Sequence, residues 1–148
     1  MAPAAQNAAV TIERRTLEEQ FTAVAYGDVG RDGLAGWLPD ALAAVAAYLQ
    51  KWGAGPVGDP YLQFVDGEVV AGYVATTPVG GEGDIEPSEL PEGEVAVLVA
   101  EAGDADAAYE SLQAWVAEQG GAPAGDGWEV LVAGDVDGKR EVHLPFTA

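Results

Sequence analysis

The sequence contains no cysteine, which excludes both disulfide bonds and thiolate metal centres. It has a single histidine, His143, and only two serines, Ser88 and Ser111, neither of which lies in the Gly-x-Ser-x-Gly context of a nucleophilic serine. The glycine-rich stretch 27–33 is followed by no Lys-Ser or Lys-Thr pair, so it is not a phosphate-binding loop. We therefore expect neither a metal nor a cofactor.

Basic residues are also scarce: six lysines and arginines stand against 25 aspartates and glutamates, giving a net charge of −19. Such a chain repels phosphate backbones and anionic lipid surfaces, so we expect no nucleic-acid partner and no membrane partner. Two interpretations of the acidity remain open. The dispersed acids either serve solubility, for example in a salty cytoplasm, or create a field that attracts cationic ligands.

Residues 1–15 contain no apolar run of signal-peptide length, and nowhere do 18 apolar residues occur together, so we expect a cytoplasmic protein. The 148 residues correspond to one domain with enough chain for a real core. Residues 1–9 are small and polar, and we expect them to form a flexible N-terminal arm. The domain then covers 10–148, with a first half at 10–79, a linker at 80–93 and a second half at 94–148.

The two halves show the same order of patterns. In the first, a strand-like stretch is followed by apolar residues at spacings of three and four over 38–52, which predict a helix. Two strands are predicted next, at 61–65 and 69–79, around an Asp-Gly hairpin turn. The second half predicts a strand at 95–100, a helix around 109–116, and strands at 128–132 and 140–146.

The halves also match residue by residue at a constant shift of 67 positions. Identical pairs are Gly53/Gly120, Pro56/Pro123, Gly58/Gly125, Asp59/Asp126, Val65/Val132, Gly67/Gly134 and Pro78/Pro145, and Tyr48 and Tyr61 fall on Trp115 and Trp128. A constant shift over this length indicates an internal duplication. The predicted fold class is α+β, with two β-α-β-β units related by a pseudo-twofold axis.

Four segments of the second half resemble the GyrI-like small-molecule-binding domain family, also known as the effector-binding domains of bacterial transcription activators. They are 107–115, 123–125, 128–130 and 140–146, and the loop 55–61 is similar to the family's matching loop in the first half. The resemblance implies a stand-alone domain with one curved antiparallel sheet, two helices on one face, and a central groove for bulky, often cationic compounds.

The resemblance also identifies Glu129 as the family's characteristic acidic residue of the Trp-Glu strand. The sequence departs from the family at Leu131, where a tyrosine is common, and at 103–105, where many members have Gly-Pro-Tyr. Both departures remove aromatic surface from the expected groove.

Strand alternation places Glu129 and Leu131 on one face and Trp128 on the other. If Trp128 packs under the helices, Glu129 faces the groove, together with its first-half equivalents Leu62 and Phe64. We therefore predict a ligand site made of Glu129, Leu131, Leu62 and Phe64, with Tyr109 at its rim. The alternatives are that Glu129 is an exposed strand residue without a function and that Tyr109 belongs to the core.

Three functions fit these features. The first is binding of a hydrophobic or cationic small molecule, for drug or toxin sequestration or for effector sensing. The second is hydrolysis of strained electrophilic toxins, with Glu129 as general base. The third is an acidic protein-interaction role, as a gyrase inhibitor or as the effector subunit of a separate regulator. In each case we expect a monomer or a small homo-oligomer.

Overall fold

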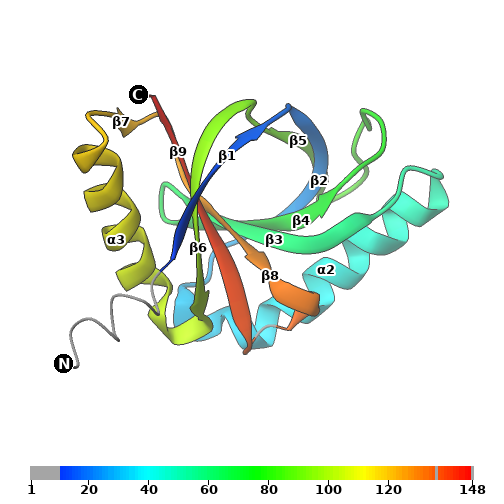
Figure 1. Ribbon diagram of the computed structural model, residues 1–148. Helices are drawn as coiled ribbons and strands as arrows, with labels where there is room; N and C mark the ends of the chain where they lie inside the picture. The colour runs from blue at the N-terminus through cyan, green and yellow to red at the C-terminus, as the bar shows by residue number, and fades with distance from the viewer. Residues whose placement is uncertain (1–10, 136, 148) are drawn as a thin grey trace.

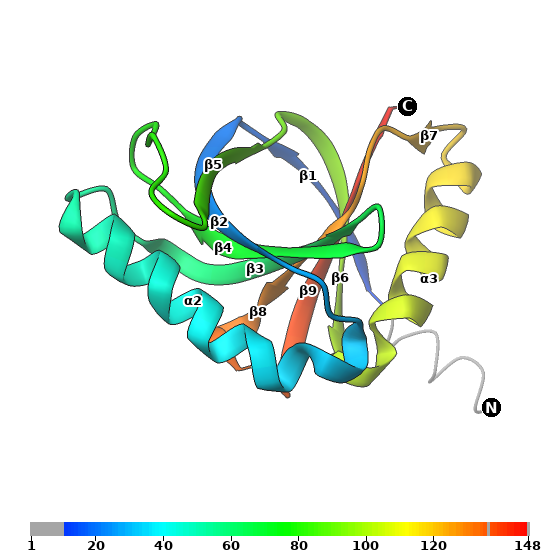
Figure 2. The same cartoon turned by 180° about the vertical axis from the view of Figure 1, so that it is seen from behind.

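The computed structural model describes residues 11–135 and 137–147, so the expected arm at 1–9 lies outside the described residues. Within these residues, nine strands form one antiparallel sheet, and two α-helices cover one of its faces (Figures 1 and 2). This confirms the predicted α+β class and the curved sheet. Neither described helix is long and apolar enough to cross a membrane.

The chain order is strand-rich in both halves. The elements are β1 (Ile12–Leu17), β2 (Gln20–Gly27), α2 (Leu34–Lys51), β3 (Val57–Val65), β4 (Glu68–Val74), β5 (Ile85–Leu90), β6 (Gly93–Glu101), α3 (Ala105–Glu118), β7 (Ala122–Pro123), β8 (Trp128–Leu131) and β9 (Lys139–Thr147). Their order across the sheet is β1-β6-β9-β8-β3-β4-β2-β5, and β7 pairs with β9.

The two copies exchange their first strands. β1 is joined to β2 by two residues but pairs with β6, and β5 is joined to β6 by two residues but pairs with β2. The registers are equivalent, since Leu17 lies opposite Gly93 and Gln20 lies opposite Leu90. Because each short connection joins strands at opposite ends of the sheet order, the sheet must curl until its edges approach each other, as Figures 1 and 2 show.

The strand exchange corrects one expectation. Residues 80–93 were expected to be a linker, but they contain β5, which is part of the sheet. The sequences of β1 and β5 both begin Ile-Glu and end in Leu, at a shift of 73. That repeat is the signal that could have identified β5, but its shift differs from 67 because both the strand-to-helix loop and the helix are longer in the first half.

The centre of the sheet carries the pseudo-twofold relation. Leu62 on β3 lies opposite Glu129 on β8, and these two residues are related by the shift of 67. Beyond β8 the shift changes: Leu62 also lies opposite Ala71, whereas Glu129 lies opposite Val142, so β4 and β9 are related by 71. A tight turn joins β3 to β4 and a longer loop joins β8 to β9. The identical residues beyond this point, such as Pro78 and Pro145, are therefore not structural equivalents.

Each helix covers its own half of the sheet with an apolar stripe. Leu38, Leu42 and other α2 residues pack on β3 and β4, and the stripe of α3 packs on β6 and β9. The opposite face lies inside the curl, where Trp128 and Tyr61 are buried. Trp128 therefore belongs to the core as predicted, but it does not pack under the helices. Glu129 faces the helix side instead.

His143 is part of the core inside the curl. Its ring stacks on Trp128, with the centroids 5.1 Å apart and the planes 13° apart. Burial lowers the pKa of His143 below its ordinary value of about 6.5, because the charged ring would lose its hydration, although the Glu141 carbonyl and carboxylate partly oppose this.

This burial predicts a pH dependence of stability. The unfolded chain takes up a proton at His143 near its ordinary pKa, whereas the folded chain resists protonation, so stability is full above that pKa and falls as pH decreases through it. We expect the free energy of unfolding, measured with urea between about pH 7.5 and pH 5.5, to fall more for the wild type than for His143→Phe, which retains the stack on Trp128. An identical pH dependence in both proteins would contradict the assignment.

Candidate functional site

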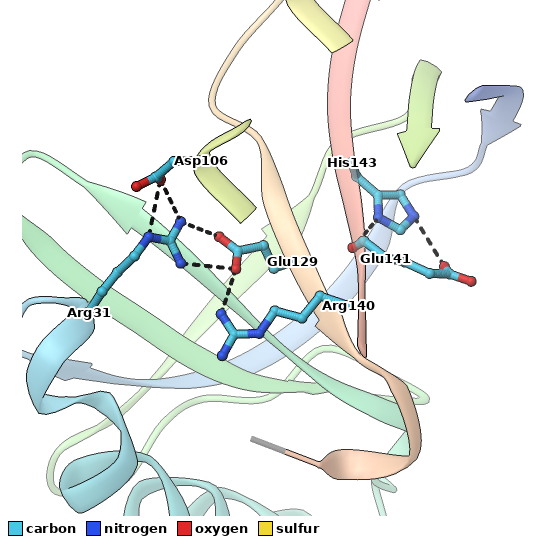
Figure 3. Close-up of polar contacts among 6 residues, drawn as sticks. All are labelled: Arg31, Asp106, Glu129, Arg140, Glu141 and His143. Atoms are coloured by element: carbon cyan, nitrogen blue, oxygen red, sulfur yellow. Dashed lines mark hydrogen bonds and ion pairs between the residues drawn. The ribbon is translucent and has the colours of Figure 1, made fainter. Parts of the chain in front are cut away.

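Glu129 is a carboxylate buried at the centre of the molecule. It lies on β8, points to the helix side of the sheet between the starts of α2 and α3, and has no exposed surface (Figure 3). Its neighbours on the same face, Leu62 and Leu131, are also fully buried and pack beneath α2. A buried charge in such surroundings is costly unless another charge compensates it.

The first compensating charge comes from β9. Arg140 Nη1 donates a hydrogen bond to Glu129 Oε1 at 2.7 Å, and the Arg140 side chain is buried as well. Arg140 lies opposite Leu131 in the β8–β9 ladder and so points to the same face. This ion pair is held between two neighbouring strands and is a fixed part of the sheet.

The second compensating charge reaches Glu129 from outside the sheet. Arg31 lies in the short helical turn η1 (Arg31–Gly33) that leads into α2. Its Nη2 donates to Glu129 Oε2 at 2.8 Å and its Nη1 to Oε1 at 3.2 Å. Its Nε donates to Asp106 in the first turn of α3 at 3.1 Å. Arg31 thus bridges the starts of both helices over the buried carboxylate.

Burial alone would lower the pKa of Arg31, but its hydrogen bonds to Glu129 and the negative charges of Glu129 and Asp106 outweigh that effect and raise it. The guanidinium is therefore charged at any physiological pH.

Two aromatic residues complete the site. The guanidinium carbon of Arg31 lies 4.6 Å from the centroid of the Phe64 ring, which is within cation–π distance. Tyr109 of α3 lies beside Gly127, and a Cβ on Gly127 would come within 2.5 Å of its ring, so only glycine permits this approach. Burial and the charge of Glu129 raise the pKa of Tyr109, which keeps the phenol neutral.

Two cavities meet at Arg31. One of about 250 Å³ is lined by Arg31, Phe64, Asp106, Tyr109, Asp126 and Gly127. The other, of about 340 Å³, includes Arg31, Asp32, Asp106, Asp137 and Arg140 in its lining. Arg31 and Asp106 line both, so their ion pair forms the boundary between the two spaces. A larger cavity of about 520 Å³ beside Trp37 shares no lining residue with either.

We call Arg31, Phe64, Asp106, Tyr109, Glu129 and Arg140 the Glu129 site. Of the five residues predicted from the sequence, Phe64 and Tyr109 line its smaller cavity, Glu129 lies buried beneath the arginines, and Leu62 and Leu131 form the apolar support under α2.

Arg31, Asp106 and Arg140 were not predicted from the sequence. For Arg140 a signal existed, because it shares strand parity with the apolar Val142 and Leu144, which places a charge on a buried face. No comparable signal identifies Arg31, because its position depends on how the two helices meet.

Within the Glu129 site two carboxylates pair with two guanidinium groups, and Asp32, Asp126 and Asp137 add further carboxylates to the lining of the two cavities. Within residues 11–135 and 137–147, no group of three or more His, Asp or Glu side chains could hold a metal ion. The arrangement offers aromatic surface and a compensated carboxylate, which suits recognition of an organic molecule.

Comparison with known proteins gives relatives by structure alone, since no protein-family model and no curated protein sequence matches the chain. The fold is similar to EcmrR in its complex with DNA, with a TM-score of 0.73 and 12% identity over 97% of this chain, which spans 60% of that chain. The EcmrR C-terminal domain alone matches over 93% of this chain and 98% of its own, with a TM-score of 0.68 and 11% identity.

Two further structures share the fold. A hydrolase from Listeria innocua has a TM-score of 0.65 and 11% identity, over 93% of this chain and 92% of that chain. SAV2435 bound to tetraphenylphosphonium has a TM-score of 0.60 and 14% identity, over 93% of this chain and 94% of that chain. These neighbours confirm the fold that the resemblance to GyrI-like domains implies.

The buried ion pair predicts a non-additive double mutant. Glu129→Leu leaves Arg140 buried without its carboxylate and should lower the free energy of unfolding by about 3–5 kcal/mol, whereas adding Arg140→Met should restore part of that loss. Leu is the matched choice because the pseudo-twofold equivalent of Glu129 is Leu62. Urea unfolding of the wild type, both single variants and the double variant measures the coupling, and strictly additive losses would show that the pair is not coupled.

Proposed function

We propose that the chain is a ligand-binding module, and that the Glu129 site binds a hydrophobic, cationic small molecule for sequestration or sensing. The observation that carries the proposal is a carboxylate with no exposed surface, placed at the pseudo-twofold axis and reached by a partly exposed cation between two cavities. A protein that needed only a stable core has no use for a charge at this position, since its equivalent in the other half is a leucine.

The physical chemistry of the site favours a cation. Glu129 requires a positive partner in its low-dielectric surroundings. The faces of Phe64 and Tyr109 supply the aromatic surface over which organic cations bind. The net charge of −19 raises the local concentration of cations around the whole molecule.

The fold neighbours support this choice. SAV2435 binds tetraphenylphosphonium, a lipophilic cation, with the same fold. EcmrR carries the same fold as the C-terminal part of a longer protein that is found in complex with DNA. A sensing role would require such a partner, whereas sequestration would require the domain alone.

Binding fits the geometry better than catalysis or a protein partnership. A general base must lie within hydrogen-bond reach of the proton it removes, and Glu129 is fully buried with both oxygens accepting hydrogen bonds from arginines. Hydrolysis therefore requires that Glu129 first be released from its arginine hydrogen bonds. In the case of binding, the ligand itself can displace an arginine. Only the acidic composition argues for a role in binding a protein partner such as gyrase.

Titration calorimetry with tetraphenylphosphonium tests the proposal. We expect saturable binding by the wild type, and Glu129→Gln should weaken it by about tenfold or more, because it removes the charge that the ligand pairs with. Glu94→Gln is the matched control, since it removes the same charge from an exposed ion pair with Arg14 and should leave the affinity almost unchanged. Equal binding by the wild type and Glu129→Gln, or absence of binding by every variant that retains Glu129, would refute the proposal.

A further inference from the structure

Arg31 makes the contacts that a bound organic cation would make. Its guanidinium donates to both oxygens of Glu129, at 2.8 and 3.2 Å, and stacks over the ring of Phe64 at 4.6 Å. These are a carboxylate partner and an aromatic face, the two features by which proteins recognise delocalised cations. The place where a ligand would bind is thus already filled by a side chain of the same chemistry.

The two arginines of the site differ in how they are held. Arg140 lies on β9 within the sheet, and its side chain is only 4% exposed. Arg31 lies in η1 between Gly30 and Gly33, outside the sheet, and its side chain is 28% exposed. In Figure 3 it reaches Glu129 from the segment leading into α2, whereas Arg140 reaches it from β9. Arg31 can therefore leave without disturbing a strand.

Charge counting defines what can replace it. With Arg31 withdrawn, Glu129 and Asp106 lose the positive charge that they share, so the site gains one uncompensated negative charge. One monovalent cation restores the balance, whereas a neutral molecule leaves the excess uncompensated. Withdrawal also removes the boundary between the cavities of about 250 and 340 Å³, because Arg31 lines both.

We propose that Arg31 is a built-in occupant of the Glu129 site, which a lipophilic monocation with delocalised charge must displace from Glu129 and Phe64 in order to bind. This inference rests on the proposed function and adds the residue that regulates access and the single charge of the ligand. Arg31 sets specificity, because a ligand can compete with it only if its pairing with Glu129 is as strong as that of a guanidinium. The apparent affinity is lower than the intrinsic affinity of the open site, because only the small fraction of molecules in which Arg31 is withdrawn can bind the ligand.

The experiment compares Arg31→Gln with Arg14→Gln. Arg14 is the matched control because it also pairs with a glutamate, Glu94, and lies over an aromatic ring, that of Phe146, but on the surface away from the site. Both variants lower the net charge equally. We expect Arg31→Gln to bind tetraphenylphosphonium about tenfold more tightly than the wild type, and Arg14→Gln to match the wild type. The neutral analogue triphenylphosphine oxide should not gain in the same way.

The outcomes separate this inference from the proposed function. If the wild type binds tetraphenylphosphonium and Arg31→Gln binds it no more tightly, the built-in occupant is refuted while the ligand site stands. An equal gain in Arg14→Gln would show a general charge effect and also refute it. If neither the wild type nor Arg31→Gln binds, both the ligand site and its occupant are refuted.

If Arg31→Gln fails to fold, a second variant can be used to test the inference. Asp106 is 83% exposed and holds Arg31 in place, so Asp106→Asn should fold and should loosen Arg31. We expect about threefold tighter binding of tetraphenylphosphonium, in line with the loss of an exposed ion pair. The direction of the change in affinity is diagnostic, because removal of a negative charge would by itself weaken cation binding. Unchanged or weaker binding by Asp106→Asn would overturn the inference.

Discussion

The buried carboxylate of Glu129 is the constraint on which the arrangement of this molecule depends. Its charge has no access to water, so cations must be brought to it, and the chain places two of its four arginines there. One comes from the neighbouring strand and the other from the start of α2, with Asp106 of α3 holding it. A strand and both helices are thus tied to one point by hydrogen-bonded charges, which is the geometry in which a buried ion network is tolerated.

The surrounding frame explains why this point lies at the centre. Two copies of a strand-rich unit exchange their first strands and also pair through β3 and β8, so the sheet curls and the axis passes through Leu62 and Glu129. The two halves thus share a backbone arrangement at this position, but one has the apolar side chain of Leu62 and the other the charged side chain of Glu129. The two helices begin close together and then run apart (Figures 1 and 2). Glu129 lies beneath Arg31, which joins their starts.

The sequence predicted the parts of this account that depend on local pattern. The apolar stripe of α2, the Asp-Gly turn after β3, and the shift that sets Leu62 against Glu129 all follow from spacing along the chain. It did not predict which face of β8 lies under the helices, because alternation separates two faces without saying which is which. It missed β5, whose prolines and acids resemble a loop, and Arg31, whose partner lies 98 residues away.

A crystal structure of the complex with tetraphenylphosphonium is the decisive test of ligand binding at Glu129, because it shows where the cation lies and where the side chain of Arg31 lies when the cation is bound. We expect the cation to lie against Glu129 and Phe64, with Arg31 withdrawn from both and the two cavities joined. Density for the cation elsewhere, for example in the cavity beside Trp37, with Arg31 still hydrogen-bonded to Glu129, would contradict it.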